Sequence, residues 1–433
     1  MNRKQLTLII VVAVVVAGLG FYAYKARNDS WEDSSQKLGQ KVIKSFPIND
    51  VERIAIKQSQ GQLDLAKKND LWTVQERGDY PANFETVSEF LRKVWDLKVA
   101  QSVDVGSSKL ARLELTPPDK STNSGTLVEF KDKSGKTLNS LLLGKKHMRE
   151  SHNDSGFGGG GWPDGRYLMV GNDAQTVAIV SEPFSNVEAK PEEWLNKDFF
   201  KVEKLKSIAI TGTNATNNWK LSRESETNEW KLADVKAGEQ LDTGKISWVN
   251  NAFSSPSFSD VATNSAPEQT GLSKPLLANV ETVDGFKYEI KAGNKISPEK
   301  DDYYVQMSVS GTFPKERAAG KDEKPEDKTK LDKEFQEKIK KLEEKLKAEK
   351  AYEKWTYVVS KWTIDPLFKE RKDLLVEKKE EPKPADTKGE EPKKTTQKTD
   401  DAKPAVKTAK LPPPTPPIPL KPEAKPDSTA ADK

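Results

Sequence analysis

The chain of 433 residues contains one order of short sequence motifs twice. The segment Val51–Ile56 (VERIAI) is echoed by Leu205–Ile210 (LKSIAI). In both copies, paired strands with a tryptophan near their end, Trp72 and Trp230, follow the echo, and a helix pattern comes next. A duplicated order of elements constrains the fold, because each copy must build the same supersecondary unit. We therefore expect two tandem repeats with one common plan.

Each copy has a helix signal that consists of a cap residue and an apolar face. Asn83 is the expected N-cap in the first copy, and Asp242 in the second. The apolar positions are Phe84, Val87, Leu91, Val94 and Trp95 in the first copy, and Ile246, Val249 and Phe253 in the second. One amphipathic helix is thus predicted to pack on each sheet.

A corner and a hairpin follow the helix signal in each copy. The corner has the pattern Leu-x-x-Pro and begins at Leu115 and at Leu272. The hairpin of the second copy turns at Asp284-Gly285, which between alternating strands is a strong hairpin signal. Its closing strands reach Gly144 in the first copy and Gly293 in the second. Strands joined by short turns predict antiparallel sheets.

These patterns predict an α+β fold with an N-terminal transmembrane helix, two tandem repeats of antiparallel β-sheet with packing helices, and a disordered tail. The expected parts are a cytoplasmic tail (1–5), a transmembrane helix (6–24), a stalk (25–41), a first α+β repeat (42–203), a second α+β repeat (204–376) with a charged helical insertion (314–350), and a disordered tail rich in Pro, Lys and Glu (377–433).

The transmembrane prediction rests on the uncharged apolar run Leu6–Tyr24. As a helix it is roughly 28 Å long, close to the ~30 Å hydrocarbon thickness of a bilayer. Arg3 and Lys4 precede it, which favours a cytoplasmic N-terminus. We therefore expect a single-pass protein of the inner (cytoplasmic) membrane, with its C-terminal body on the extracytoplasmic side.

The charged insertion carries one apolar stripe of a helix. Its members, at spacings of three and four, are Leu331, Phe335, Ile339, Leu342 and Leu346. Such a stripe must be covered, either by the body of the same chain or by a partner helix in a short coiled coil. In the tail, Leu411–Leu420 (LPPPTPPIPL) predicts extended polyproline II, as a stiff spacer or a docking ligand.

The order of elements resembles the bacterial domain-of-unknown-function 4340 family. The features that carry the resemblance are the hairpin at Trp72, the pair Tyr80-Pro81 before the helix, the corner at Leu115 and the strand ending Leu143-Gly144. The chain departs from the family at Leu113-Glu114, where a Tyr-Gly pair usually precedes the corner leucine. The resemblance implies a single-span envelope protein encoded near ABC-type export or gliding-associated permeases, and it supplies no catalytic residues.

No motif predicts a catalytic, cofactor or metal site. Gly156–Gly161 (GFGGGG) formally fits a dinucleotide fingerprint, but it leads into a strand at Tyr167 instead of a helix. His147 and His152 are the two histidines, and five residues apart on a glycine-rich loop they do not preorganise a zinc site. Cysteines are absent, and a net charge of +4 carries no signal for nucleic acid. We expect no cofactor.

Two tryptophans are candidate binding residues. Trp31 lies in the predicted stalk and Trp162 in the glycine-rich loop, whereas Trp72, Trp95 and Trp230 occupy core positions. An exposed aromatic side chain suits sugar stacking or a protein contact, and local packing is the alternative.

The leading functional hypothesis is a non-enzymatic accessory or scaffold of an envelope complex, with an ABC-type permease as the partner implied by the resemblance. The alternatives are a glycan- or peptidoglycan-binding module and an envelope hydrolase. The hydrolase would need a cleft of convergent carboxylates, which no motif indicates.

Overall fold

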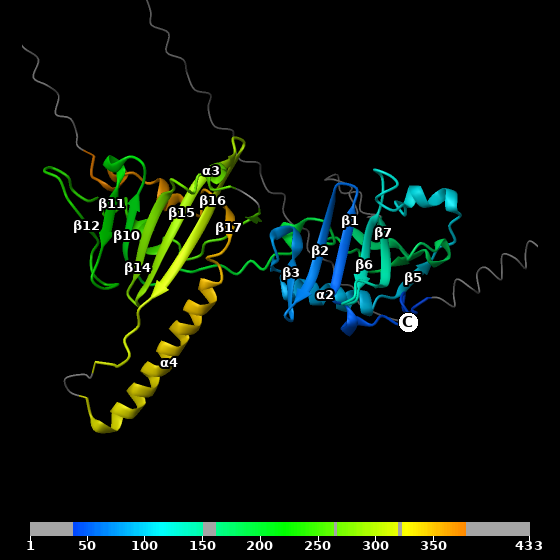
Figure 1. The fold of residues 1–433 in the computed structure, drawn as a ribbon, viewed down its shortest axis with the longest axis horizontal. Helices are drawn as coiled ribbons and strands as arrows, with labels where there is room; N and C mark the ends of the chain where they lie inside the picture. Colours follow the sequence, from blue (N-terminus) through cyan, green and yellow to red (C-terminus); the bar gives the residue numbers. More distant parts are fainter. Residues whose placement is uncertain (1–37, 150–161, 264–265, 319–322, 378–433) are drawn as a thin grey trace, which may run out of the picture. The chain divides into compact units, whose positions relative to one another are not determined.

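The structure is a computed structural model that describes residues 38–149, 162–263, 266–318 and 323–377. These residues form two antiparallel sheets (Figure 1). In the first sheet the strands lie in the order β4-β3-β2-β1-β6-β7-β8-β9-β5. Their bounds are β1 (Arg53–Gln58), β2 (Gly61–Lys68), β3 (Leu71–Val74), β4 (Tyr80–Pro81), β5 (Val99–Ser102), β6 (Thr126–Lys131), β7 (Thr137–Met148), β8 (Pro163–Val170) and β9 (Ala178–Val180).

The second sheet has the order β12-β11-β10-β14-β15-β16-β17-β13, which is the order of the first sheet without β4. Its strands are β10 (Leu205–Thr211), β11 (Trp219–Ser222), β12 (Lys231–Leu232), β13 (Asp260–Ala262), β14 (Leu276–Thr282), β15 (Phe286–Ser297), β16 (Lys300–Gly311) and β17 (Thr356–Ser360). The duplication in the sequence is therefore a duplication of strand order.

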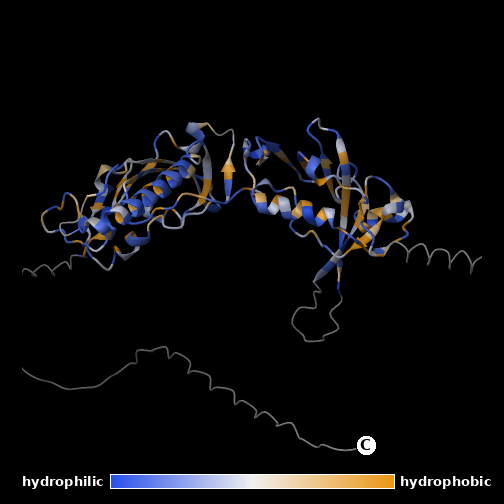
Figure 2. Cartoon of the chain, turned by 90° about the horizontal axis from the view of Figure 1, so that it is seen from below, coloured by the Kyte–Doolittle hydropathy of each residue, from blue (hydrophilic) through white to orange (hydrophobic). Residues whose placement is uncertain are grey.

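The described α-helices are α2 (Phe84–Trp95), α3 (Pro267–Thr270) and α4 (Pro325–Lys350). The described 3-10 helices are η1 (Ile48–Asp50), η2 (Gln75–Arg77), η3 (Ser107–Leu113), η4 (Ala174–Thr176), η5 (Pro191–Glu193), η6 (Ala215–Asn217), η7 (Ser247–Asn251), η8 (Asp365–Phe368) and η9 (Arg371–Leu374). Figure 2 shows hydrophobic residues along the strands and a mostly hydrophilic α4.

The echoed segments form equivalent central strands. Ile54 in β1 lies between Leu65 of β2 and Phe130 of β6. Ile208 in β10 lies between Leu221 of β11 and Val280 of β14. All six side chains are at most 1% exposed, so this row forms the core of each sheet. Alternating side chains along β6 and β14 are buried on one face, as expected for a sheet covered on one side.

The sequence predicted that the strands end at Gly144 and Gly293, but β7 continues to Met148 and β15 to Ser297. Each glycine lies against the Leu-x-x-Pro corner of its own repeat. A Cβ atom on Gly144 would contact the carbonyl oxygen of Leu113, and one on Gly293 would contact that of Thr270, each closer than 3.0 Å. The pairing register shifts directly after Leu143 in β7 and after Ala292 in β15, so each glycine begins a β-bulge. Only a residue without a side chain permits this approach of strand and corner.

The first predicted helix is confirmed. The Asn83 Oδ1 atom accepts a hydrogen bond from the Thr86 amide at 3.1 Å, so Asn83 is the N-cap of α2. The buried face consists of Val87, Phe90, Leu91 and Val94. Phe84 and Trp95 were wrongly placed on this face, because they are 68% and 45% exposed. The ammonium of Lys41 lies 3.3 Å from the centroid of the Trp95 ring.

The second predicted helix is wrong in type. Asp242 caps a turn, since its Oδ1 atom accepts from the amides of Gly244 and Lys245. Ile246, Val249 and Phe253 are buried as predicted. The backbone nevertheless forms only the short 3-10 helix η7. Weak helix formers, Asn250-Asn251 and Ser254-Ser255-Pro256, fill the segment, and Phe253 leaves helical geometry at φ +56°.

The predicted fold class therefore needs correction. The described residues are mostly β-sheet. The helix α2 packs on the first sheet, whereas the corresponding segment of the second repeat forms only η7. Among the described ranges, no helix is both long and apolar enough to cross a membrane. The predicted span Leu6–Tyr24 lies outside the described residues, as do the tail beyond Glu377 and its segment Leu411–Leu420. The transmembrane helix and the single-pass inner-membrane placement are thus unsupported, and the corrected architecture is the pair of sheets.

Candidate functional site

The helix α4 interrupts the second repeat between β16 and β17. It begins at Pro325, where the fixed φ of proline suits the first helical position. Glu326 and Asp327 lie in the first turn, and Lys347 and Lys350 in the last, so the charges complement the helix dipole. The sequence placed a helix in this charged insertion, and α4 confirms it.

The C-terminal half of α4 is anchored on the second sheet. Leu342 and Leu346 pack against the hydrophobic core. Glu349 is 5% exposed. Its carboxylate accepts hydrogen bonds from the Tyr288 hydroxyl at 2.8 Å and from the Lys201 amide at 3.0 Å. Burial raises the pKa of Glu349 despite these bonds.

Two lysines of α4 add ionic contacts. The Lys345 ammonium lies 2.7 Å from the Glu203 carboxylate, and the Lys338 ammonium 2.8 Å from the Asp284 carboxylate. Lys204 contacts the same carboxylate at 2.9 Å. Burial opposes ionisation of Asp284, but the hydrogen bonds from Lys338 and Lys204 outweigh it and hold the pKa of Asp284 below its ordinary value.

The N-terminal half of α4 is not covered in the same way. Phe335 and Ile339 are half-buried, and Leu331 is 36% exposed. Figure 1 shows that the C-terminal end of α4 lies at the sheet, while its N-terminal end extends away from it. The apolar stripe of α4 is therefore divided. The second sheet covers only its C-terminal part.

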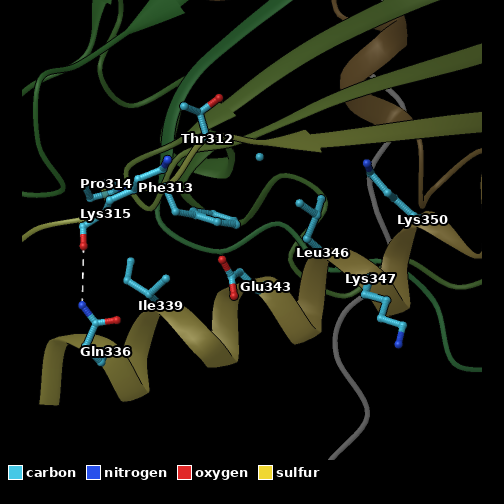
Figure 3. A pocket seen from close by; sticks show the side chains of 11 residues that line it. Thr312, Phe313, Pro314, Lys315, Gln336, Ile339, Glu343, Leu346, Lys347 and Lys350 are labelled. Atoms are coloured by element: carbon cyan, nitrogen blue, oxygen red, sulfur yellow. Dashed lines mark hydrogen bonds between the residues drawn. The ribbon is translucent and has the colours of Figure 1, made fainter. Parts of the chain in front are cut away.

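An open groove of about 730 Å³ lies beside this divided stripe (Figure 3). One wall is the helix face with Gln336, Ile339 and Leu346, and the other is the segment that leaves β16 at Phe313 and Pro314. Phe313 is held in place by the Phe286 ring, with the ring centroids 5.1 Å apart. The apolar floor is thus fixed by the sheet.

The charges around the groove are unequal. Its lining includes the three lysines Lys315, Lys347 and Lys350 and a single carboxylate, that of Glu343. An apolar groove with a basic rim suits an amphipathic segment with acidic residues beside its apolar face. Within the described ranges, no group of three or more His, Cys, Asp or Glu residues is arranged to hold a metal ion.

The candidate residues from the sequence lie elsewhere. Trp162 precedes β8 in the first sheet, is 61% exposed, and its carbonyl oxygen accepts from the Arg149 amide at 3.0 Å. Trp31, His152 and the segment Gly156–Gly161 lie outside the described residues. His147 Nδ1 lies 2.7 Å from the Asp164 carboxylate on the surface.

The comparison with protein families gives one match. Residues 72–275 match the family described as "Domain of unknown function (DUF4340)". This stretch of the chain belongs to the DUF4340 family. No curated protein and no solved structure matches it.

The DUF4340 match begins at Trp72 and ends at Pro275, the last residue of the second corner. It therefore includes both Leu-x-x-Pro corners, and α4 and the groove lie beyond it. The groove residues that sequence reasoning missed are Phe313 and Pro314. Their only signal is that Phe313 ends the last regular pattern before the charged insertion.

Proposed function

We propose that the protein is a non-enzymatic accessory or scaffold that binds an amphipathic helix of a partner protein in the groove beside α4. The observation that carries the proposal is the divided stripe: Leu342 packs on the core and does not line the groove, whereas Ile339 lines the open groove together with Phe313. Helix-in-groove binding uses apolar anchors at helical spacing.

The charges favour one kind of partner. Three lysines and one glutamate line the groove, so acidic residues on the flanks of the partner helix would be attracted and basic ones repelled. The resemblance to the DUF4340 family adds an ABC-type permease as a partner class, and this identification is part of the proposal.

The test is site-specific photo-crosslinking in the native host. A photoreactive phenylalanine replaces Gln336, which lies at the edge of the groove. We expect an adduct whose crosslinked segment, identified by mass spectrometry, is an amphipathic helix with acidic flanks. Ile339→Glu should abolish the adduct, because it places a charge in the apolar floor.

Lys341→Glu is the matched control, because Lys341 is exposed and two residues from Ile339 on the helix, at about 200° around its axis. It adds the same carboxylate to the opposite face and should leave the adduct unchanged. Equal loss in both variants, or an adduct to a second copy of this chain or to a segment that is not helical, contradicts the proposal.

A further inference from the structure

The duplicated fold forms a hollow at the same place in each repeat. In the first repeat it lies between α2 and the loop that follows β9, and in the second between η7 with its following residues and the loop that follows β17. The hollow measures about 180 Å³ in the first repeat and about 400 Å³ in the second. One architectural feature has thus acquired two different linings.

Charged side chains occupy the hollow of the first repeat. Lys93 crosses it, with its ammonium 3.0 Å from the Glu89 carboxylate and 3.6 Å from that of Glu182. The second hollow has a different lining, in which Trp248 and Trp362 replace these ion pairs. The lining of the first hollow is therefore charged, and the lining of the second is aromatic.

The two tryptophans are positioned by the fold. Trp248 is half-buried and packs edge-on against Trp219, with centroids 6.1 Å apart. Trp362 is 68% exposed, although tryptophan is usually largely buried. It sits in a tight turn in which the Thr363 amide donates to the Ser360 carbonyl at 3.0 Å, so its exposure is built into the backbone.

Hydrogen-bonding groups surround the tryptophans. Asn251, Ser254 and Asp365 line the hollow, and Asp365 pairs through Oδ2 with Lys369 at 2.9 Å. Thr363 also lines it, is 7% exposed, and its buried Oγ1 atom has no hydrogen-bond partner among the described residues. A buried hydroxyl without a partner costs stability.

From this lining we infer that the hollow of the second repeat binds a hexopyranose unit of a neutral saccharide. A pyranose ring has an apolar C–H face, which suits the indole of Trp362, and a rim of hydroxyl groups, which suits amide, hydroxyl and carboxylate partners. No Lys or Arg is among the described residues that line the hollow, and the Lys369 ammonium beside it is already paired with Asp365, so the lining favours a neutral ligand over a phosphate or a carboxylate. This site is independent of the groove beside α4.

The test is titration of the full chain with cellohexaose, chitohexaose and maltohexaose, followed by tryptophan fluorescence and calorimetry. At least one of the three should bind with a Kd below about 10 mM, which is the weak end of specific binding. Trp362→Ala should weaken binding by about tenfold or more, and Asn251→Ala should weaken it by a smaller factor.

Phe84→Ala is the matched control, because Phe84 is an aromatic residue that is 68% exposed, as Trp362 is, and it lies in α2 of the first repeat. It should leave the Kd unchanged. Both aromatic side chains are exposed, so circular dichroism and thermal midpoints should stay as in the parent protein. The inference is overturned if none of the three sugars binds, if Trp362→Ala binds like the parent, or if decaproline binds at Trp362 and no sugar does.

Discussion

Replacing Gly144 in β7 or Gly293 in β15 by alanine should destabilise the repeat that contains it. Each glycine lies against the backbone carbonyl two residues before the corner leucine, and an added Cβ would approach that oxygen closer than 3.0 Å. At Gly144 it would also meet Leu115 Cδ2 at 2.8 Å, and Leu115 is 1% exposed. A backbone oxygen cannot rotate away as a flexible side chain can, so strand and corner must separate.

The expected cost is at the upper end of that for overpacked cores, about 3 kcal/mol for each substitution. This corresponds to a change of more than about 100-fold in the folding equilibrium. With a urea dependence of about 3 kcal/mol per M, the unfolding midpoint of the affected repeat should fall by about 1 M. The assay is urea unfolding followed by circular dichroism and tryptophan fluorescence.

Gly106→Ala is the matched control. A Cβ atom on Gly106 would have nothing within 4 Å, and its φ of −60° suits any residue. Its midpoint should stay the same or rise slightly, since alanine restricts the unfolded chain more than glycine does. If Gly144→Ala and Gly293→Ala unfold at the parental urea concentration, the close approach of corner and strand is not what fixes these positions.

Two further predictions concern buried polar groups. Because burial raises the pKa of Glu349, the folded protein holds its proton more tightly than the unfolded chain, so stability should fall as the pH rises above the ordinary glutamate pKa of about 4.3. Glu349→Gln should reduce the change of the urea midpoint between pH 4.5 and pH 8. If the midpoint of the variant changes with pH as that of the parent does, other groups cause the pH dependence. Thr363→Val should stabilise the protein by about 1 kcal/mol, because it removes a buried hydroxyl that has no partner among the described residues. A lower unfolding midpoint would show that the hydroxyl is satisfied.

Local signals were sufficient for the elements that depend on nearby residues. Three signals act through contacts within a few residues. The echoed segments Val51–Ile56 and Leu205–Ile210 specify a strand, the Asn83 cap specifies a helix start, and the Asp284-Gly285 turn specifies a hairpin. Because both copies repeat these signals in one order, the common order of elements along the chain was predictable, whereas the order of the strands within each sheet came from the structure. The prediction of a helix after Asp242 was wrong. The apolar spacing of the segment was that of a helix, but its helix propensity was too low.

What the sequence alone determined was therefore the periodic and local part of the protein: two copies of antiparallel strands, one good helix in the first copy, and an amphipathic helix in the charged insertion. Only the tertiary structure decided which apolar positions are covered. Leu342 and Ile339 belong to one stripe, yet Leu342 packs on the core and Ile339 lines a groove with Phe313. The sequence also could not predict that Trp362 lies exposed beside Trp248, because the two residues are more than 100 positions apart. Such contacts depend on how distant strands and loops meet in space, and no spacing along the chain encodes that meeting.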